Sequence, residues 1–365
     1  MGHRHSRRNI GRRATGIVAL VALCLLCLPA ISASVDESRF QSYIERHDNG
    51  WIDWQNGLIY GIGRGYLKKN RNSRPLARGV GEVLASGNIV KLAAGLHLDE
   101  ARTLESLGGG KITVNLKAFI RDKQYKSTYV ENNGDPYYEI VKVSSMKGIS
   151  GLTAKLLDHL AKDPVWRDLP VRNPEPREDL GDEGQPWLLL DARGLTDNRQ
   201  VQPALLPKIK SETGEEIYNV KGVEAAALVD RGMMSYVTTD ASAEELRSDA
   251  GLVDSILARA GLLVGVGEAV AGAVEDFPDR NGETGTPHRR ERRRRGRYIV
   301  ANVKDVQGLA KTNLVVSATE AMELKAEDAN SQILKKCRVV VVVSSPIGGI
   351  EGRLPLRLAE LAPGR

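Results

Sequence analysis

The stretch that decides the fold is Trp51-Ile52-Asp53-Trp54, followed by Asn56-Gly57 and Leu58-Ile59-Tyr60-Gly61-Ile62-Gly63. Two strand-like apolar runs flank an Asn-Gly pair. Such a pair is a strong short-range signal for a β-hairpin, because both residues tolerate the backbone of a tight turn. We therefore expect a strand pair over residues 51–67. Residues 35–50 are polar, and we expect a loose arm there.

The segment after the hairpin predicts a helix over residues 75–94, because its apolar residues recur at the spacing of one helix face. The expected buried residues are Leu76, Val80, Val83, Leu84 and Val90. Alternating side chains predict a strand over 111–119. Asn132-Asn133-Gly134 indicates a turn into another strand at 138–143. Residues 152–161 have the pattern of a second amphipathic helix.

The second half of the chain begins after residues 164–186, which contain five prolines and an acidic cluster and are typical of a linker. A buried strand is expected from Trp187. Arg338 is followed by five valines, which predict a strand buried on both faces. Further strands are expected at 298–303 and 313–316, and a helix from 318 to 325 or beyond.

These elements indicate an α+β protein with two domains, each a mixed or antiparallel sheet packed by amphipathic helices. We expect six segments in chain order. They are a signal peptide at 1–34, an N-terminal α+β domain at 35–163, the Pro- and acid-rich linker at 164–186, a C-terminal α+β domain at 187–345, a mobile Arg-rich loop at 276–297 within that domain, and a tail at 346–365.

The first 34 residues have the order of a secretory signal peptide. Five arginines precede an uninterrupted apolar run at 17–28, and Pro29 and small residues follow it. The run is too short for a stable membrane-spanning helix. We expect export to the periplasm or to the outer membrane. A retained membrane anchor and a buried core helix are the alternatives, and Sec and twin-arginine export both stay open.

The basic excess is confined to two segments. The whole chain has 52 basic and 46 acidic residues, and removing the five signal arginines leaves 47 and 46. Residues 289–297 hold seven further cations and one acid, so the remaining body has 40 basic and 45 acidic residues. Net charge therefore gives no support for nucleic-acid binding, and we expect no nucleic-acid partner.

The Arg-rich segment has two interpretations. It is either a solvated loop or an anion-binding patch for phospholipid or lipopolysaccharide head groups or for an acidic protein. The candidate anion-binding residues are Arg289, Arg290, Arg292, Arg293, Arg294, Arg295 and Arg297.

No sequence motif indicates a catalytic activity. The histidines beyond the signal are far apart and lack the spacing of metal ligands. No serine occupies a nucleophile elbow, and the glycines near residue 265 do not complete a nucleotide-binding fingerprint. Asp191 and Arg193 are expected to form a salt bridge at a strand end. We therefore expect no catalytic, cofactor-binding or metal-binding residue and no cofactor.

Cys337 is the one cysteine beyond the signal. It stands just before the valine strand, so we expect it to be a buried small hydrophobe, with a reactive or intermolecular thiol as the alternative.

Two blocks resemble known families. Residues 111–120, continuing through 124–129 to 138–143, resemble the second half of the domain of flagellar-P-type outer-membrane lipoproteins and, more loosely, the N-terminal domain of flagellar assembly protein T. Residues 187–195, with 203–209, 312–317 and 337–343, resemble the C-terminal part of uncharacterised exported bacterial proteins that carry such a domain. A lipid-attachment cysteine needs a small residue directly before it. Leu23 and Leu26 precede Cys24 and Cys27, so we expect neither cysteine to carry a lipid.

The resemblance implies an envelope protein with a structural, assembly or binding role, in a flagellar or outer-membrane complex with envelope proteins as partners. It carries over no functional residue. The alternative from another class is an exported hydrolase whose site is assembled from distant Asp, Glu and His residues. A deep pocket with converging carboxylates and a shifted histidine would favour the hydrolase, and open surfaces would favour binding. Oligomeric state is left open.

Overall fold

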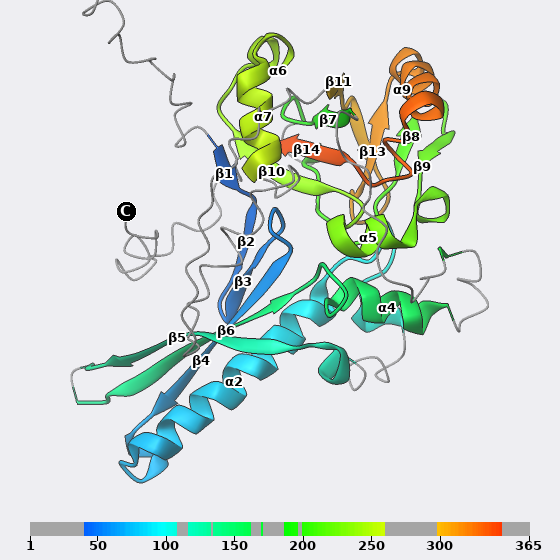
Figure 1. Ribbon diagram of the computed structural model, residues 1–365. Coiled ribbons are helices and arrows are strands. Elements are labelled where there is room, and N and C mark those ends of the chain that lie inside the picture. Colours follow the sequence, from blue (N-terminus) through cyan, green and yellow to red (C-terminus); the bar gives the residue numbers. More distant parts are fainter. Residues whose placement is uncertain are drawn as a thin grey trace, which may run out of the picture. The chain divides into compact units, whose positions relative to one another are not determined.

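The computed structural model describes residues 40–107, 116–132, 134–161, 169–170, 186–195, 199–259 and 298–344 (Figure 1). These residues form three β-sheets with helices packed against them. One sheet is antiparallel, and the other two combine parallel and antiparallel strands. The predicted α+β class, with mixed or antiparallel sheets, is therefore confirmed.

The first sheet, here called the N-terminal sheet, is antiparallel throughout. Its strands, in spatial order, are β2 (Ile44–His47), β3 (Gly50–Asp53), β4 (Leu58–Tyr66), β6 (Tyr137–Ser145) and β5 (Asp122–Val130). The predicted hairpin is confirmed, because β3 pairs with β4. Gly57 in the turn has a left-handed φ of 67°. The Asn56 backbone N–H donates to the Asp53 carboxylate at 3.0 Å, which closes the turn.

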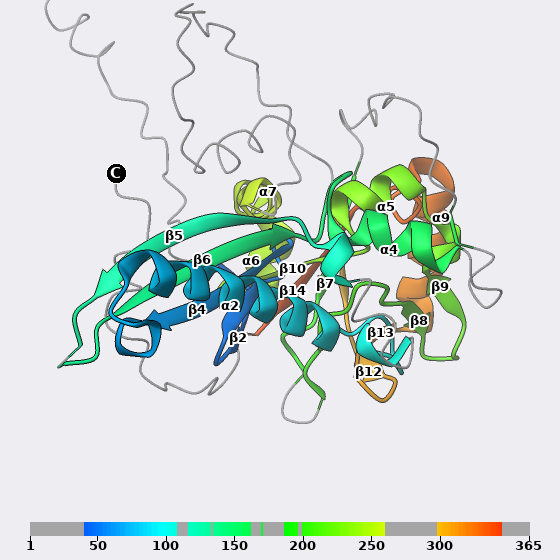
Figure 2. The same ribbon diagram turned by 90° about the horizontal axis from the view of Figure 1, so that it is seen from below.

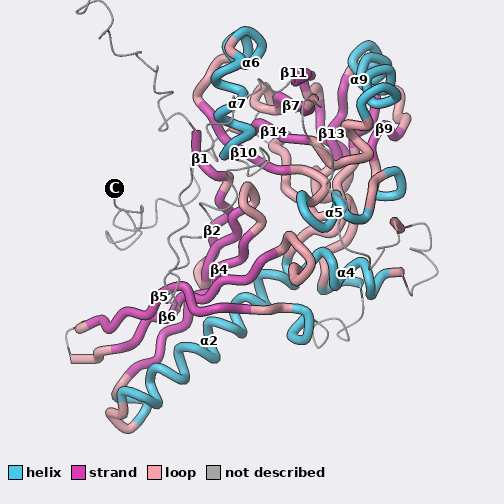
Figure 3. The backbone as a smooth tube through the Cα atoms, viewed as in Figure 1, coloured by secondary structure: helices cyan, strands magenta, loops and turns pink. Residues whose placement is uncertain are grey.

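Helix α2 (Arg74–Gly95) lies along this sheet beside β4 and β6, where the sequence predicts a helix (Figure 3). The prediction of its buried face is wrong, except for Val90. The buried residues between Arg74 and Ile89 are small or β-branched: Ala77, Gly81, Ala85 and Ile89. The apolar residues expected in the core are exposed instead: Leu76, Val80, Val83 and Leu84.

Three glycines of β4 explain this reversal. An ideal Cβ on Gly61, Gly63 or Gly65 would lie 2.3, 2.0 or 1.7 Å from a carbonyl oxygen of α2. The two backbones therefore approach more closely than any side chain on these glycines would permit. Such an approach also needs small residues on the facing side of the helix, so shape rather than hydrophobicity decides which face is buried.

The second sheet is mixed and is built around β14 (Val339–Val343). Its order is β1 (Phe40–Ser42), β10 (Ser235–Thr239), β14, β7 (Trp187–Asp191) and β11 (Tyr298–Asn302). The last four strands are parallel, and β1 pairs antiparallel with β10. All five valines of β14 are buried, which confirms the strand predicted to be buried on both faces.

The third sheet has the order β12 (Asp305–Gln307), β13 (Asn313–Val316), β8 (Ile209–Ser211) and β9 (Glu216–Tyr218). The remaining α-helices with described bounds are α4 (Leu152–Leu160), α5 (Ala225–Arg231), α6 (Ala243–Ser248), α7 (Ala250–Arg259) and α9 (Ala318–Ser331). Single 3-10 turns are η2 (Lys68–Asn70), η3 (Glu105–Leu107) and η6 (Val220–Gly222). Helices α6 and α9 each begin with a capping box, which satisfies their first backbone N–H groups.

Two further expectations are corrected. The loose arm expected at 35–50 contains β1 and β2, which pair with the edges of two different sheets. Residues 116–119 of the strand expected at 111–119 are helical, and Leu116 is fully buried. A short apolar alternation does not distinguish a strand from one buried turn of helix. Residues 111–115 lie outside the described residues.

The signal peptide, the Arg-rich loop and the C-terminal tail also lie outside the described residues. The division into two domains stays a prediction. Trp54 and Tyr236 come from the two predicted domains, and their rings meet edge to face with centroids 6.0 Å apart.

Candidate binding surface

The outer face of α2 carries an exposed apolar stripe. Leu76, Val80, Val83 and Leu84 are 53%, 38%, 73% and 46% exposed, respectively. Their spacing of four, three and one residues places them on one side of the helix, away from the sheet. Figure 2 shows α2 across β4 and β6, with no other described helix or strand over this part of it. We call these four residues the α2 stripe.

A group of cations precedes the stripe. Between Asp53 and Glu82 the chain has six basic residues and no acidic one. Arg64 pairs with Glu139 at 2.9 Å, and Arg78 pairs with Glu82 at 3.1 Å. Within the described residues the other four form no ion pair with an acid. We call these four the basic turn: Lys68, Lys69, Arg71 and Arg74.

The basic turn is held by the backbone and by tyrosines. The Leu67 carbonyl accepts hydrogen bonds from the backbone N–H groups of Asn70 and Asn72, each at 2.9 Å. Arg71 has a left-handed φ of 55°, which reverses the chain into α2. The Lys69 ammonium lies 5.2 Å from the centre of the Tyr66 ring, and the Arg74 guanidinium lies 5.2 Å from the centre of the Tyr129 ring. Cation–π contacts of this length order the long side chains without neutralising them.

The start of α2 is electrostatically unbalanced. Its first turn has no acidic residue, and Ser73 at the N-cap makes no side-chain capping bond. The N-terminal end of a helix carries partial positive charge, which favours acidic side chains there. Four cations in this position lower the stability of the helix slightly. They also concentrate positive potential near the N-terminal end of α2.

A cleft lies near the other end of α2. Its volume is about 220 Å³, and its lining residues are Glu45, His47, Asn49, Ile52, Lys91, Leu92 and Gly95. The Glu45 carboxylate accepts hydrogen bonds from the Trp54 indole at 2.8 Å and from the His47 ring at 2.9 Å. None of the lining residues is a serine, threonine or cysteine that could act as a nucleophile.

The charges in this cleft stabilise each other. Burial alone would raise the pKa of Glu45, but the hydrogen bonds from His47 and Trp54 lower it below its ordinary value. The hydrogen bond to Glu45 raises the pKa of His47. The pair therefore favours carboxylate and imidazolium, which is the state of an ion pair rather than that of a neutral general base.

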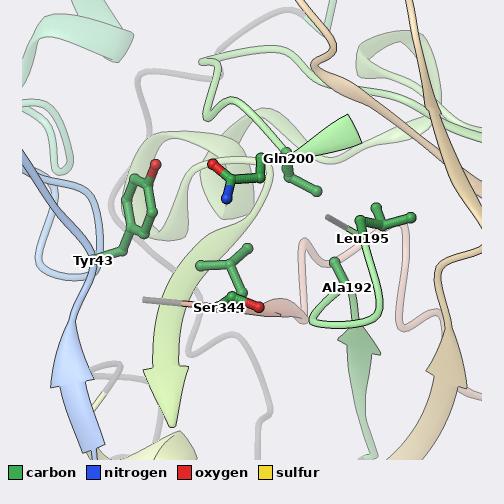
Figure 4. Close-up of a pocket in the computed structure, with 7 residues that line it drawn as sticks. Tyr43, Ala192, Leu195, Gln200 and Ser344 are labelled. Carbon is green, nitrogen blue, oxygen red and sulfur yellow. The ribbon is translucent and has the colours of Figure 1, made fainter. Parts of the chain in front are cut away.

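A smaller pocket lies at the carboxyl ends of β7 and β14 (Figure 4). It is lined by Tyr43, Ala192, Leu195, Gln200, Val201, Val343 and Ser344. This edge of a parallel sheet is where ligands often bind. The cavity volume, however, is about 10 Å³, which is room for no more than about one water molecule. The pocket therefore does not accommodate a cofactor or substrate in this conformation.

Asp191 and Arg193 form the predicted salt bridge beside this pocket, with Arg193 Nη2 2.7 Å from Asp191 Oδ2. Burial opposes ionisation of Asp191, but hydrogen bonds from Arg193 outweigh it and lower the pKa of Asp191. Arg193 also donates to the Ala241 carbonyl, so the pair ties the end of β7 to the segment after β10. This arrangement is structural.

The remaining sequence-predicted residues divide into two groups. Cys337 is buried, and burial raises the pKa of its thiol to about 12, which confirms the interpretation as a buried hydrophobe. The seven arginines of the predicted anion-binding patch lie outside the described residues.

The described residues contain no group of three or more His, Cys, Asp or Glu placed to hold a metal ion. Among the described helices, none has the length and apolar character needed to cross a membrane.

The sequence analysis predicts neither the α2 stripe nor the basic turn as a surface. It places the stripe residues in the core, because periodicity alone does not tell which face of a helix meets a neighbour. The signal for the basic turn was available, since no acid stands between Asp53 and Glu82. A second signal was the Gly61-x-Gly63-x-Gly65 run, which predicts a backbone approached closely by another element.

Comparison with known families concerns the second half of the chain. Residues 187–257 and 283–345 match a family model described as Treponema pallidum Tp0624, second domain. The matched residues include the four parallel strands of the mixed sheet and the whole third sheet. They lie within the predicted C-terminal domain at 187–345. The match covers less than half of the chain, so it is a similarity of this part alone. A comparison with curated proteins gave no match.

Proposed function

We propose that this chain is an exported cell-envelope protein that acts by binding, in a structural or assembly role, and that the outer face of α2 is its contact surface. The observation that carries the proposal is the α2 stripe. Scattered exposed apolar residues are ordinary on soluble proteins, whereas a contiguous apolar patch marks an interaction site. Here four such side chains lie together on one helix face.

The envelope location is supported by the sequence of residues 1–34, with its arginine-rich start and apolar run. The resemblance of residues 111–143 to the flagellar-P-type lipoprotein domain suggests a flagellar or outer-membrane complex as the setting. Envelope proteins are accordingly the proposed partners.

Cell fractionation tests this proposal. We expect a mature form shorter by roughly 32–34 residues, recovered with the envelope. Replacing the four stripe residues with glutamine should move the protein to the soluble fraction while leaving it folded, because these side chains are 38–73% exposed and glutamine is tolerated in an exposed helix position. A full-length cytoplasmic product, or envelope recovery unchanged by the four substitutions, would overturn the proposal.

One observation favours the alternative of an exported hydrolase, namely the Glu45–His47 pair in the 220 Å³ cleft. The pair has a carboxylate and a histidine with a raised pKa, but the lining residues add no nucleophile. Hydrolysis of an envelope glycan or ester that is lost in Glu45→Gln, with the fold intact, would favour this alternative over binding.

A further inference from the structure

We infer that the cleft beside the C-terminal end of α2 binds the terminal carboxylate of a short peptide that ends in a small apolar residue. The inference goes beyond the proposed function and is independent of it, since none of the four stripe residues lines the cleft. The cleft offers two cations, one hydrogen-bond acceptor and an apolar floor, and such a ligand has a partner for each of them.

The β2–β3 hairpin forms one wall of the cleft, and the last turns of α2 form the other. Antiparallel pairing sets Glu45 opposite Ile52, so both side chains lie on the same face of the sheet. An ideal Cβ on Gly50, at the turn of the hairpin, would lie 2.9 Å from Leu92 Cδ1 of the helix. The two walls therefore touch at this point, and the cleft is formed before any ligand binds.

Asn49 supplies the acceptor. The Asn88 side-chain amide donates to the Ile62 carbonyl at 2.6 Å, and a backbone carbonyl only accepts, so the Asn88 side-chain oxygen is left to accept another hydrogen bond. The Asn49 amide donates to that oxygen at 3.3 Å. This chain of hydrogen bonds fixes the orientation of both amides. It leaves the Asn49 side-chain oxygen without a donor among the described residues, and a ligand N–H can provide one.

The lining of the cleft has more positive than negative charge. Both Glu45 oxygens are already used, one by the His47 ring and the other by the Trp54 indole. The Lys91 ammonium forms no ion pair with an acid in the part of the chain that the structure describes. His47 and Lys91 thus provide two cations for one carboxylate. Asp48 favours the charged form of His47 but does not line the cleft.

A ligand carboxylate matches these two cations. The hydrogen bond to Glu45 uses Nε2 of His47 and raises the pKa of the ring, so the imidazolium has a second donor at Nδ1. The Lys91 ammonium adds further donors. Hydrogen bonds between two charged groups are shorter and stronger than neutral ones. A ligand ammonium would be repelled here, because the Glu45 carboxylate is already occupied.

The apolar floor and the volume set the size of the ligand. Ile52 and Leu92 line the cleft and are buried. A cavity of about 150 Å³ holds benzene, so this cleft of about 220 Å³ holds roughly ten non-hydrogen atoms. Small-molecule sites are typically apolar, with a few polar groups that fix the orientation of the ligand. The cleft thus has room for one terminal residue with its carboxylate and the peptide group before it.

The experiment is a ligand-observed NMR titration of the purified protein with three probes. N-acetylvaline carries the carboxylate, the N–H and a branched apolar side chain. Its primary amide, N-acetylvalinamide, lacks the negative charge. The third probe, 3-methylbutanoate, keeps the carboxylate and the apolar side chain but lacks the N–H.

Two glycines of α2 provide a blocking variant and its matched control. Gly95→Leu adds bulk to the cleft without displacing an atom, because Gly95 lines the cleft and nothing lies within 4 Å of its ideal Cβ. Gly79 has the same free space but does not line the cleft, so Gly79→Leu is the control. Both variants should unfold at the same or a higher temperature, since leucine is a better helix former than glycine. Lys91→Gln removes a cation, and Lys91→Arg retains it.

We expect N-acetylvaline to bind with a Kd of about a millimolar, which is ordinary for a ligand of this size. Its amide should bind at least about tenfold more weakly, and Lys91→Gln should weaken N-acetylvaline by about tenfold, because each change removes a charge-assisted hydrogen bond. Binding of 3-methylbutanoate should be several-fold weaker, since it offers no N–H to Asn49. Gly95→Leu should abolish binding, whereas Gly79→Leu and Lys91→Arg should bind like the unchanged protein.

Four results would overturn the inference. Equal affinity for N-acetylvaline and its amide would show that the cations do not recognise a carboxylate. Equal affinity for 3-methylbutanoate would show that the ligand is a simple acid rather than a peptide end. Unchanged binding in Gly95→Leu, or an equal loss in Gly79→Leu, would place the site elsewhere. The absence of saturable binding at concentrations well above the expected Kd would show that the cleft is not a site for this ligand.

Discussion

An ideal Cβ on Gly63 of β4 would lie 2.0 Å from the carbonyl oxygen of Gly81 in α2. This distance is far shorter than any ordinary carbon–oxygen contact. Helix and strand therefore meet backbone to backbone. The contact selects the small face of α2 for burial and leaves its large apolar side chains exposed, which is the basis of the proposed binding surface.

Gly63→Ala should destabilise the protein by about 3 kcal/mol or more, because the added methyl has no flexible neighbour to displace and must push the helix away. Chemical denaturation measures the change. Gly79→Ala on α2, the helix that faces Gly63, is the control, since nothing lies within 4 Å of its ideal Cβ. It should stabilise the protein by about 0.5–1 kcal/mol through helix propensity. Equal effects of the two substitutions would contradict the backbone contact.

The Glu45–His47 pair predicts a pH-dependent stability difference between the protein and His47→Gln. The pKa of His47 is raised in the folded state. The contribution of the pair to the free energy of unfolding is therefore fully present below the ordinary pKa of 6.5 and is lost as pH rises through the folded pKa. The pKa of Glu45 is lowered, so the contribution also declines in acid as that carboxylate is protonated. His47 is 39% exposed, so the difference should stay below about 1 kcal/mol. Urea unfolding at pH 5.5 and 8.5 measures it, and a larger difference at the higher pH would refute the assignment.

Burial of Lys147 should make the free energy of unfolding depend on pH in the opposite direction. Its ammonium donates to the Gln55 carbonyl at 3.1 Å and to the Ser235 hydroxyl at 3.2 Å, and burial lowers its pKa to about 8 from the ordinary 10.5. The unfolded chain then holds more protons than the folded one between these values. The stability of the protein relative to Lys147→Met should therefore rise across this range, by at most about 3 kcal/mol. The residue keeps some solvent exposure, so this figure is an upper bound. A flat difference would show that Lys147 titrates normally.

Cys337 should be protected from thiol reagents in the native mature protein. Burial raises the pKa of its thiol to about 12, and the thiolate is the reactive form. Maleimide labelling should be slow in buffer and fast in denaturant. Rapid labelling of the native protein would show instead that Cys337 is a reactive thiol.

Much of the fold was predictable, because local signals decide it. Asn56-Gly57 specified the first hairpin, and five consecutive valines specified the central strand β14. The strand predicted at 111–119 failed at residues 116–119, since the helix there buries Leu116 through a tertiary contact that no local pattern records. Strands β1 and β2 were missed for the same reason, because partner edges rather than their own apolar pattern hold them in place.

The candidate surface was less predictable than the fold. The helical period of residues 75–94 was found, but its two faces were exchanged. A stripe of Leu and Val indicates burial on hydrophobicity alone, whereas Gly61, Gly63 and Gly65 accept only a small-residue face. The sequence contains both patterns. The close packing of α2 on β4 decides which face of the helix is buried.

A fluorescent label on the stripe itself measures whether the outer face of α2 contacts the envelope. In the mature protein carrying Val83→Cys, an environment-sensitive fluorophore is attached to the new thiol. The label should react at position 83 alone, because Cys337 is buried. Met322→Cys on α9 serves as the control site. On addition of envelope fragments from the producing cells, we expect a blue shift and loss of quenching by aqueous iodide at position 83, with no change at 322. An unchanged spectrum at 83, or equal changes at both positions, would contradict the claim that the outer face of α2 is the contact surface.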